Sequence, residues 1–355
     1  MKRAMTSRER VLTAIHHQEP DRVPFNYYGN PGIDRRLREH FGKDDILEAL
    51  GVDFRSVGAP YIGKPTHQKN GDIIVDEWGI RQRWVRNEYG GFWEYCDWPL
   101  RDADIEAIEA WAFPNPDDYD YASVRDACNR HQKHCICAGG AGIPDVINSC
   151  SFLRTMEQVL LDLITDNEAG LRLIERRNSI LMEITRRTLE AGSGKIDMLC
   201  LGEDLGTQRG PTISIELFRK HIRPRIQGFV DLARSFNIPT MFHSCGSSSW
   251  AFDDFIEIGI NVVETLQPEA LNMSPRYLKS RYGGRLAFHG CISTAGPLAY
   301  GSRQDVIRTV RETLDIMMPG GGYILSPTHL VQDNTPAENV LALYDAGRTY
   351  GVYAV

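Results

Sequence analysis

Residues 238–246 read IPTMFHSCG, residues 260–267 read INVVETLQ, and residues 285–292 read RLAFHGCI. Each stretch is a short apolar run, rich in β-branched or aromatic residues, that carries polar side chains toward its end. Segments of helical character, WAFDDFIEIG at 250–259 and SPRYLKSRYG at 274–283, separate the three runs. Strands that alternate with helices of this length are typical of parallel βαβ units, so this part of the chain predicts a parallel α/β sheet.

The same alternation continues in both directions along the chain. The expected strands lie near Pro24, Cys135, Met198, Met241, Val262, Ala287 and Ile324, with an eighth near residues 52–57. Eight such strands predict a (β/α)8 TIM barrel with an N-terminal extension. A doubly wound open sheet is the alternative, but no strand is followed by the glycine fingerprint of a dinucleotide site. Because we find no internal repeat and no low-complexity linker, we expect residues 1–355 to form a single domain.

Residues 71–98 interrupt this rhythm. They are rich in β-branched and aromatic residues, and Gly79 and the Gly90-Gly91 pair are the expected turns. This pattern is typical of antiparallel hairpins and predicts an insertion into the barrel. The aromatic residues from Trp78 to Trp98 favour an ordinary buried hairpin core, and a partner dock or a lid is the alternative.

The bulk composition excludes several classes of protein. The net charge of −7 lacks the basic footprint of a nucleic-acid-binding protein. The first 18 residues, MKRAMTSRERVLTAIHHQ, have no apolar core of a secretory signal, and no apolar run is long enough to cross a bilayer. We therefore expect a soluble, cytoplasmic protein that binds neither nucleic acid nor membrane, with cysteines that are not joined in disulfides.

Polar side chains gather at the ends of the later strands. In chain order they are Glu203, Asp204 and Gln208; His243 and Cys245; Glu264 and Gln267; His289 and Cys291; and Ser326 and His329. In a barrel these strand ends converge on one mouth, which is where barrel enzymes carry out their chemistry. A single polar residue at a strand end is usually a structural hydrogen bonder, but five successive ends are harder to explain in that way.

His243 and Cys245 form the sharpest pair. Positions i and i+2 of a strand point to the same side, so the imidazole and the thiol are expected to lie together. One nitrogen and one sulfur ligand suit zinc. The pattern is short and also occurs by chance, and in that case both residues only pack.

The chain resembles the uroporphyrinogen decarboxylase superfamily along nearly its whole length. SRERVLTAIHHQEPDRVP at 7–24 is similar to the N-terminal signature of that superfamily, and GEDLGTQRGPTISIELFRKHIRPR at 202–225 is similar to its central segment. FHSCG, NVVETLQPEA, HGCIS and GGGYILSPTH match its later strand ends in order. The resemblance implies a (β/α)8 barrel.

One segment departs from the decarboxylases of this superfamily. They carry an arginine-rich segment after the first strand, which grips the carboxylates of the substrate. Here residues 26–36 read NYYGNPGIDRR, with neutral Asn26, Tyr27 and Tyr28 at the start. We therefore expect Asn26 and Tyr27 to line a site for a different substrate, together with Gln208, Gln267 and Ser326.

The other large branch consists of corrinoid-linked methyltransferases, which hold zinc with a His-x-Cys pair and a later cysteine. Cobalamin-independent methionine synthases are similar, with a glutamate on the next strand and a cysteine on the last. The resemblance places His243 and Cys245 at the pair and Glu264 at the glutamate, while Ser326 stands at the last position. Either Cys291 supplies the sulfur, or the metal has only three protein ligands, or the site no longer holds metal.

The expected activity is zinc-dependent methyl transfer between a small methylated substrate or thiol acceptor and a corrinoid. No segment resembles a corrinoid-binding module, so the corrinoid is expected on a separate partner protein. Zinc would polarise the substrate heteroatom. Asp204 or Glu203 would handle a proton and His289 or His329 would orient the substrate, or these four would only hydrogen-bond the residues that do.

Two other functions remain open. In a metal-free decarboxylase, acidic and arginine residues would dominate the site, and a metal assay separates this alternative from the first. A non-enzymatic binding protein on the same barrel, such as a partner of a corrinoid carrier, predicts no turnover with any methyl donor.

Overall fold

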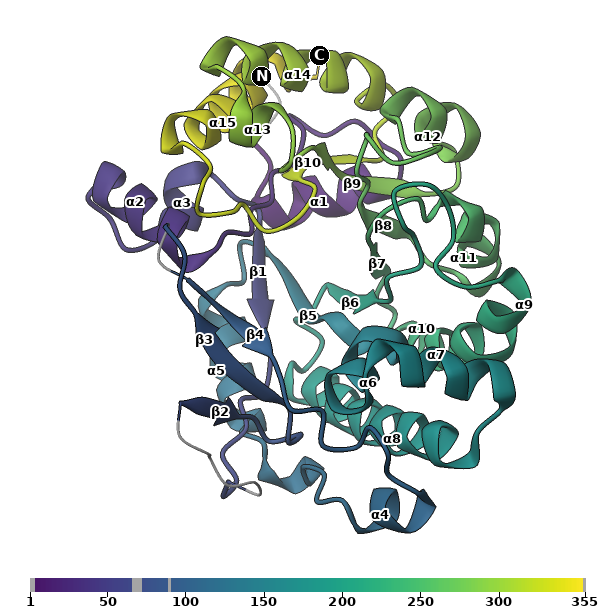
Figure 1. Ribbon diagram of the computed structural model, residues 1–355. Helices are drawn as coiled ribbons and strands as arrows, with labels where there is room; N and C mark the ends of the chain where they lie inside the picture. The colour runs from purple at the N-terminus through teal and green to yellow at the C-terminus, as the bar shows by residue number, and fades with distance from the viewer. Residues whose placement is uncertain (1–3, 66–71, 89–90, 354–355) are drawn as a thin grey trace.

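Seven parallel strands form the central sheet in the computed structural model, which describes residues 4–65, 72–88 and 91–353. In sheet order they are β1 (Phe54–Val57), β5 (Cys135–Pro144), β6 (Met198–Gly202), β7 (Thr240–Ser244), β8 (Val262–Thr265), β9 (Ala287–Ile292) and β10 (Tyr323–Pro327). The sheet curls so that its strands surround a central space (Figure 1). The predicted α/β class is confirmed, and these strands lie at seven of the eight expected positions.

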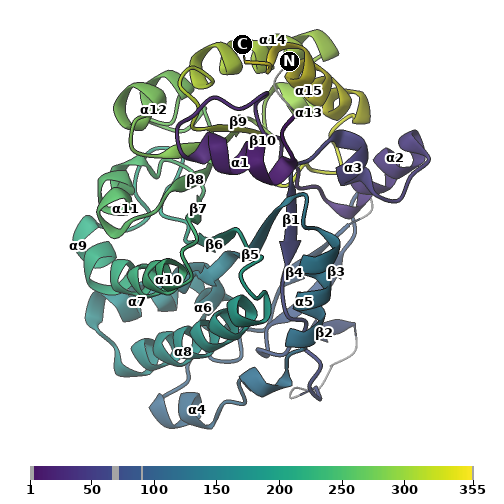
Figure 2. The same cartoon turned by 180° about the vertical axis from the view of Figure 1, so that it is seen from behind.

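Helices cover the outside of the curled sheet, as the view from behind also shows (Figure 2). They are α1 (Ser7–Ile15), α2 (Pro31–Phe41), α3 (Ile46–Leu50), α4 (Ile105–Ala110), α5 (Tyr121–Arg130), α6 (Val146–Arg154), α7 (Met156–Thr165), α8 (Glu168–Ala191), α9 (Ile215–Leu217), α10 (Arg223–Ser235), α11 (Phe252–Ile258), α12 (Pro275–Tyr282), α13 (Pro297–Tyr300), α14 (Arg303–Met317) and α15 (Ala337–Tyr350). Within the described ranges, none of these helices has both the length and the apolar character that a membrane span requires.

The expected first strand, at residues 23–27, forms only one parallel bridge, between Phe25 and Leu325 of β10. Two features interrupt a regular ladder. Pro24 has no N–H to donate, and the N–H of Phe25 donates to the side chain of Asp53 at 2.8 Å. The carbonyl of Phe25 still accepts from the N–H of Asp53 at 2.9 Å, so this segment lies between β10 and the start of β1.

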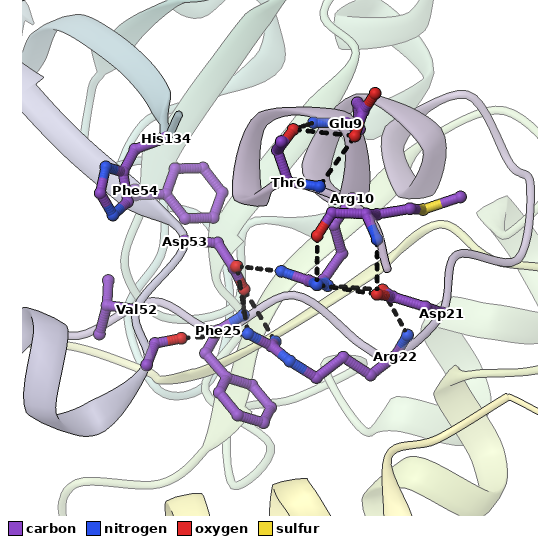
Figure 3. Close-up of polar contacts among 12 residues, drawn as sticks. Thr6, Glu9, Arg10, Asp21, Arg22, Phe25, Val52, Asp53, Phe54 and His134 are labelled. Atoms are coloured by element: carbon purple, nitrogen blue, oxygen red, sulfur yellow. Dashed lines mark hydrogen bonds and ion pairs between the residues drawn. The ribbon is translucent and has the colours of Figure 1, made fainter. Parts of the chain in front are cut away.

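A buried carboxylate holds this segment in place (Figure 3). Asp53 is fully buried and pairs with Arg10 of α1 at 2.6 Å and with Arg22 at 2.9 Å. Removing one partner of a buried ion pair typically costs about 3–5 kcal/mol, because an uncompensated charge remains. The network therefore fixes α1 and residues 22–26 against β1, and with them the position of Asn26 at the site.

The predicted hairpin insertion is confirmed in its described part. It is a separate three-stranded antiparallel sheet of β2 (Ile73–Val75), β3 (Arg81–Val85) and β4 (Phe92–Tyr95). Gly79 makes the first turn with a φ of +84°, and Gly90 of the second expected turn lies outside the described residues.

The expectation that the hairpin aromatics form a buried core is wrong for most of them. Trp78 is 9% exposed, but Trp84 and Trp93 are 44% and 40% exposed, and their rings meet edge to face with centroids 5.3 Å apart. A three-stranded sheet has little interior of its own, so it leaves one face to solvent. Tyr95 stacks on Phe152 of α6 with ring centroids 3.6 Å apart, which anchors the end of β4 to the barrel.

Candidate active site

A row of three side chains crosses neighbouring strands of the sheet. His243 on β7 is in register with Glu264 on β8, which is in register with His289 on β9. Nδ1 of His243 lies 2.9 Å from Oε1 of Glu264, and Nδ1 of His289 lies 3.4 Å from Oε2 of the same carboxylate. All three side chains line one cavity, so the strand ends converge as the sequence predicts.

The edge of the His243 ring opposite Glu264 faces the thiol of Cys245, as expected. Nε2 of His243 lies 3.5 Å from Sγ of Cys245, and the His243 ring lies 5.8 Å from that of His329. One ligand atom from each of these three residues falls within 4.8 Å of the other two. Two imidazole nitrogens and one sulfur fit the ligand preference of zinc, so this group, called here the His–Cys–His group, is a candidate metal centre.

The backbone around Cys245 is clamped by side chains from neighbouring loops. The N–H of Cys245 donates to Oδ1 of Asp204 at 2.8 Å, and the N–H of Gly246 donates to Oε1 of Gln267 at 2.6 Å. Gly246 has a φ of +69°, and a Cβ there would lie 2.3 Å from the carbonyl oxygen of Gly206. Only glycine fits such a close approach, and it lets the chain turn away directly after the thiol.

Charge and burial set the protonation states of Glu264 and of the histidines around it. Burial alone would raise the pKa of Glu264, but the hydrogen bond from His243 and the nearby imidazoles outweigh it, so the pKa is lowered. Burial lowers the pKa of His289 and of His329, which keeps both imidazoles neutral at pH 7. For His243 the hydrogen bonds to Cys245 and Glu264 outweigh burial and raise the pKa. A metal cation would take the place of the proton on the side that faces Cys245.

Asn26 sets the tautomer of His289. Its Oδ1 accepts from the N–H of Tyr27 at 2.9 Å, so its Nδ2 must face the other way. That nitrogen lies 2.9 Å from Nε2 of His289 and 3.0 Å from the hydroxyl of Tyr28. Because an amide nitrogen is only a donor, Nε2 of His289 is an acceptor, and the imidazole proton sits on Nδ1, toward Glu264.

Two spaces meet at the His–Cys–His group. The inner cavity, of about 280 Å³, is lined among others by Tyr28, Cys200, Glu264, Thr265, His289 and Leu330. The outer hollow, of about 470 Å³, is lined among others by Tyr95, Asp145, Asn148, Ser149, Phe152 and Asp204. His243 and His329 line both spaces, so a metal ion held there would face both of them.

The two predicted acidic residues of β6 face different surroundings. Glu203 is 1% exposed and accepts from the N–H groups of Val146 at 2.7 Å and Ile147 at 3.1 Å, at the N-terminus of α6. Asp204 lines the outer hollow, and its Oδ1 lies 3.8 Å from Nε2 of His243. Asp204 is therefore the one of the two that lies beside the candidate metal centre.

Four of the predicted site residues lie away from the row of His243, Glu264 and His289. The hydroxyl of Tyr27 donates to Asp34 at 2.8 Å, on the side away from the inner cavity. Gln208 is exposed, and Cys291 is buried in the apolar core with a φ of +69° that breaks the strand alternation. Ser326 is fully buried, and its hydroxyl makes no hydrogen bond to any residue that the structure describes.

The predicted set of site residues did not include Tyr28 and Asp145, two polar residues that line these spaces. Tyr28, and not Tyr27, lines the inner cavity, and the period of two in an extended segment would have paired it with Asn26. Asp145 lines the outer hollow, and its position directly before α6 was its only signal. Burial and the charge of Asp204 raise the pKa of Asp145 to about 6, although Ser149 donates to it.

Metal-ligating and acidic side chains thus meet at one mouth of a curled parallel sheet, where enzymes of this fold class have their active sites. Residues 95–350 match the model of the uroporphyrinogen decarboxylase (URO-D) family, and the chain belongs to that family. No curated protein matches the sequence.

One solved structure shows that the chain shares a known fold. A methyltransferase from Methanosarcina mazei superposes with a TM-score of 0.69 at 17% identity, over 98% of this chain and 99% of that one. D-psicose 3-epimerase gives a TM-score of 0.37 at 12% identity, over 65% of this chain and 83% of that one. The IolI protein with a bound zinc atom gives a TM-score of 0.36 at 13% identity, over 64% of this chain and 78% of that one. The last two scores are too low to inform on function.

Proposed function

We propose that the protein is a zinc-dependent methyltransferase that moves a methyl group between a small methylated substrate or thiol acceptor and a corrinoid on a partner protein. The observation that carries this proposal is the His–Cys–His group, which stands between the inner cavity and the outer hollow. We also propose that residues 23–27 complete an eight-stranded barrel, because they hydrogen-bond to both β10 and Asp53.

The residues of the site divide into those that hold the metal and those that support them. His243, Cys245 and His329 would hold zinc, which when bound acts as a Lewis acid on the substrate heteroatom. Glu264 keeps the proton of His243 on Nδ1 and so leaves Nε2 as the ligand atom, the arrangement found behind most zinc-bound histidines. Asp204 fixes the backbone of Cys245 and lies beside His243, where it would handle a proton of the substrate heteroatom.

The two spaces suit a transfer between two bound molecules. The inner cavity would take the small substrate, with its methyl group directed toward the outer hollow. The outer hollow would admit the corrinoid of the partner protein, and the stacked Tyr95 and Phe152 form part of its wall. This division brings the methyl donor and the methyl acceptor together at the metal, and holding two reactants in the right geometry lowers the barrier to their reaction.

The family itself favours a second candidate, decarboxylation without a metal. A porphyrinogen needs cations for its carboxylates, and none of the fourteen residues that line the inner cavity is lysine or arginine. Carbon dioxide release from a porphyrinogen by the metal-free protein would establish the decarboxylase and overturn the methyltransferase.

The test combines the zinc-loaded protein with reduced cobalamin and an uncharged methyl ether. Methylcobalt formation, followed by the cobalt absorption spectrum, is the expected result. His243→Ala should abolish it, and His40→Ala, a control at an exposed position on α2, should leave it unchanged. If neither direction, methyl ether to cobalt or methylcobalt to a thiol, proceeds above the background rate, the proposal fails.

A further inference from the structure

The wall of the inner cavity has no permanent cation. Its fourteen lining residues include one carboxylate, Glu264, and no lysine or arginine. A zinc ion held by one thiolate and two neutral imidazoles would carry one net positive charge, which the carboxylate of Glu264 balances. A ligand with a carboxylate away from the metal would therefore bury that charge without a counter-charge, which costs several kcal/mol.

Tyr28 gives the same wall a directed hydrogen-bond donor. The hydroxyl of Tyr28 accepts from Nδ2 of Asn26 at 3.0 Å, and this is its only hydrogen bond within the described part of the chain. Its own proton is therefore free to point into the cavity. Burial raises the pKa of Tyr28 well above its usual value, so the group remains a phenol and a donor.

The volume and the remaining wall restrict the ligand further. A cavity of about 280 Å³ lies at the small end of ligand pockets, which range from roughly 300 to 1,000 Å³. Leu330, Pro327 and Ala141 contribute apolar surface, and Gly139 and Gly140 contribute backbone. Such a wall favours a compact, largely apolar molecule with one acceptor oxygen.

We propose that the inner cavity selects a small uncharged molecule, that Tyr28 donates a hydrogen bond to an oxygen of this molecule, and that carboxylated analogues are excluded. That the ligand is methylated rests on the proposed function. That the ligand is small and uncharged, and that it accepts a hydrogen bond from Tyr28, rests only on the lining and volume of the cavity.

Three probes distinguish the effect of the ligand's charge on binding from the effect of its size. They are 2-methoxyphenol, 4-hydroxy-3-methoxybenzamide, and 4-hydroxy-3-methoxybenzoate, which has nearly the shape of the amide but carries a charge. Calorimetric titration of the zinc-loaded protein at pH 7 should show binding of the two neutral probes. The carboxylate should bind at least about 30-fold more weakly than the amide, because its charge is buried unpaired. Equal affinity for amide and carboxylate, or no binding of either neutral probe, would overturn the proposal.

A pair of adjacent tyrosines provides the matched variants. Tyr28→Phe should weaken binding of the neutral probes about 3- to 10-fold, because one buried hydrogen bond is lost. Tyr27→Phe should not change it, since that hydroxyl bonds to Asp34 outside the cavity. Unchanged affinity in Tyr28→Phe would contradict the role of this residue. Binding does not require methyl transfer, so neutral probes that bind without forming methylcobalt would sustain the cavity proposal and count against the methyltransferase.

Discussion

Oε1 of Glu264 lies 2.9 Å from Nδ1 of His243, while Sγ of Cys245 lies 3.5 Å from Nε2 on the opposite edge of the same ring. An imidazole cannot offer one nitrogen to both neighbours, so the carboxylate and the candidate metal position are on different sides. The sequence resemblance implies that Glu264 is a ligand, but this geometry favours a supporting role, which the measurements below can decide.

Glu264→Gln should lower zinc affinity about 10- to 100-fold. The amide is neutral, and its nitrogen would face the Nδ1 proton of His289 if its oxygen kept the bond to His243. Competition titration with a coloured zinc chelator measures the change, and Glu312→Gln on the exposed face of α14 is the control. Equal zinc affinity in Glu264→Gln and the wild type would show that the carboxylate does not support the site.

Asn26→Asp should reverse the tautomer of His289. A carboxylate can only accept, so the imidazole proton should move from Nδ1 to Nε2, and the bare Nδ1 would then face Oε2 of Glu264, another acceptor, at 3.4 Å. The expected loss in the free energy of unfolding is about 1–3 kcal/mol. Nitrogen-15 NMR of labelled histidine reports the tautomer directly, and Asn30→Asp, at a position nearer the surface, is the control. A proton on Nε2 already in the wild type would refute the assigned tautomer.

Glu203→Gln tests whether this buried glutamate is structural or catalytic. The amide nitrogen of glutamine would face one of the N–H donors at the start of α6, so we expect a loss of about 1–3 kcal/mol in the free energy of unfolding. The rate of methyl transfer by the folded variant should stay within about twofold of the wild type. Lost activity at unchanged stability would instead establish the proton-handling role that the sequence suggests.

The stability of the metal-free protein should depend on Asp145 between about pH 4 and pH 6. Burial and the charge of Asp204 raise the pKa of this carboxyl to about 6, above its unfolded value of about 3.9. The folded state then holds the proton more tightly, so stability falls as the pH rises through this window. Asp145→Asn should remove this dependence and gain up to about 3 kcal/mol over the wild type at pH 7. Denaturant unfolding in chelator across the window measures the difference, and parallel pH profiles would contradict it.

The sequence predicts the positions of seven strands and the convergence of His243, Glu264 and His289, because each depends on local patterns and on the parallel arrangement. It does not predict that residues 23–27 lack a regular ladder, because the side chain of Asp53, distant in sequence, takes the N–H of Phe25. Which of Tyr27 and Tyr28 lines the inner cavity likewise depends on how that segment is rotated about its axis. Glu203 caps α6 only because the N-terminus of that helix lies beside it in the folded chain.

The His–Cys–His group as a zinc site is the central claim, and X-ray absorption at the zinc edge tests it most directly. The wild-type protein, purified without added metal or chelator, should contain about one zinc per chain. Its spectrum should show one sulfur at about 2.3 Å and at least two nitrogens at about 2.0 Å, and the sulfur signal should vanish in Cys245→Ala. A protein that refuses added zinc, or a shell with two sulfurs that would bring in Cys291, would contradict the account.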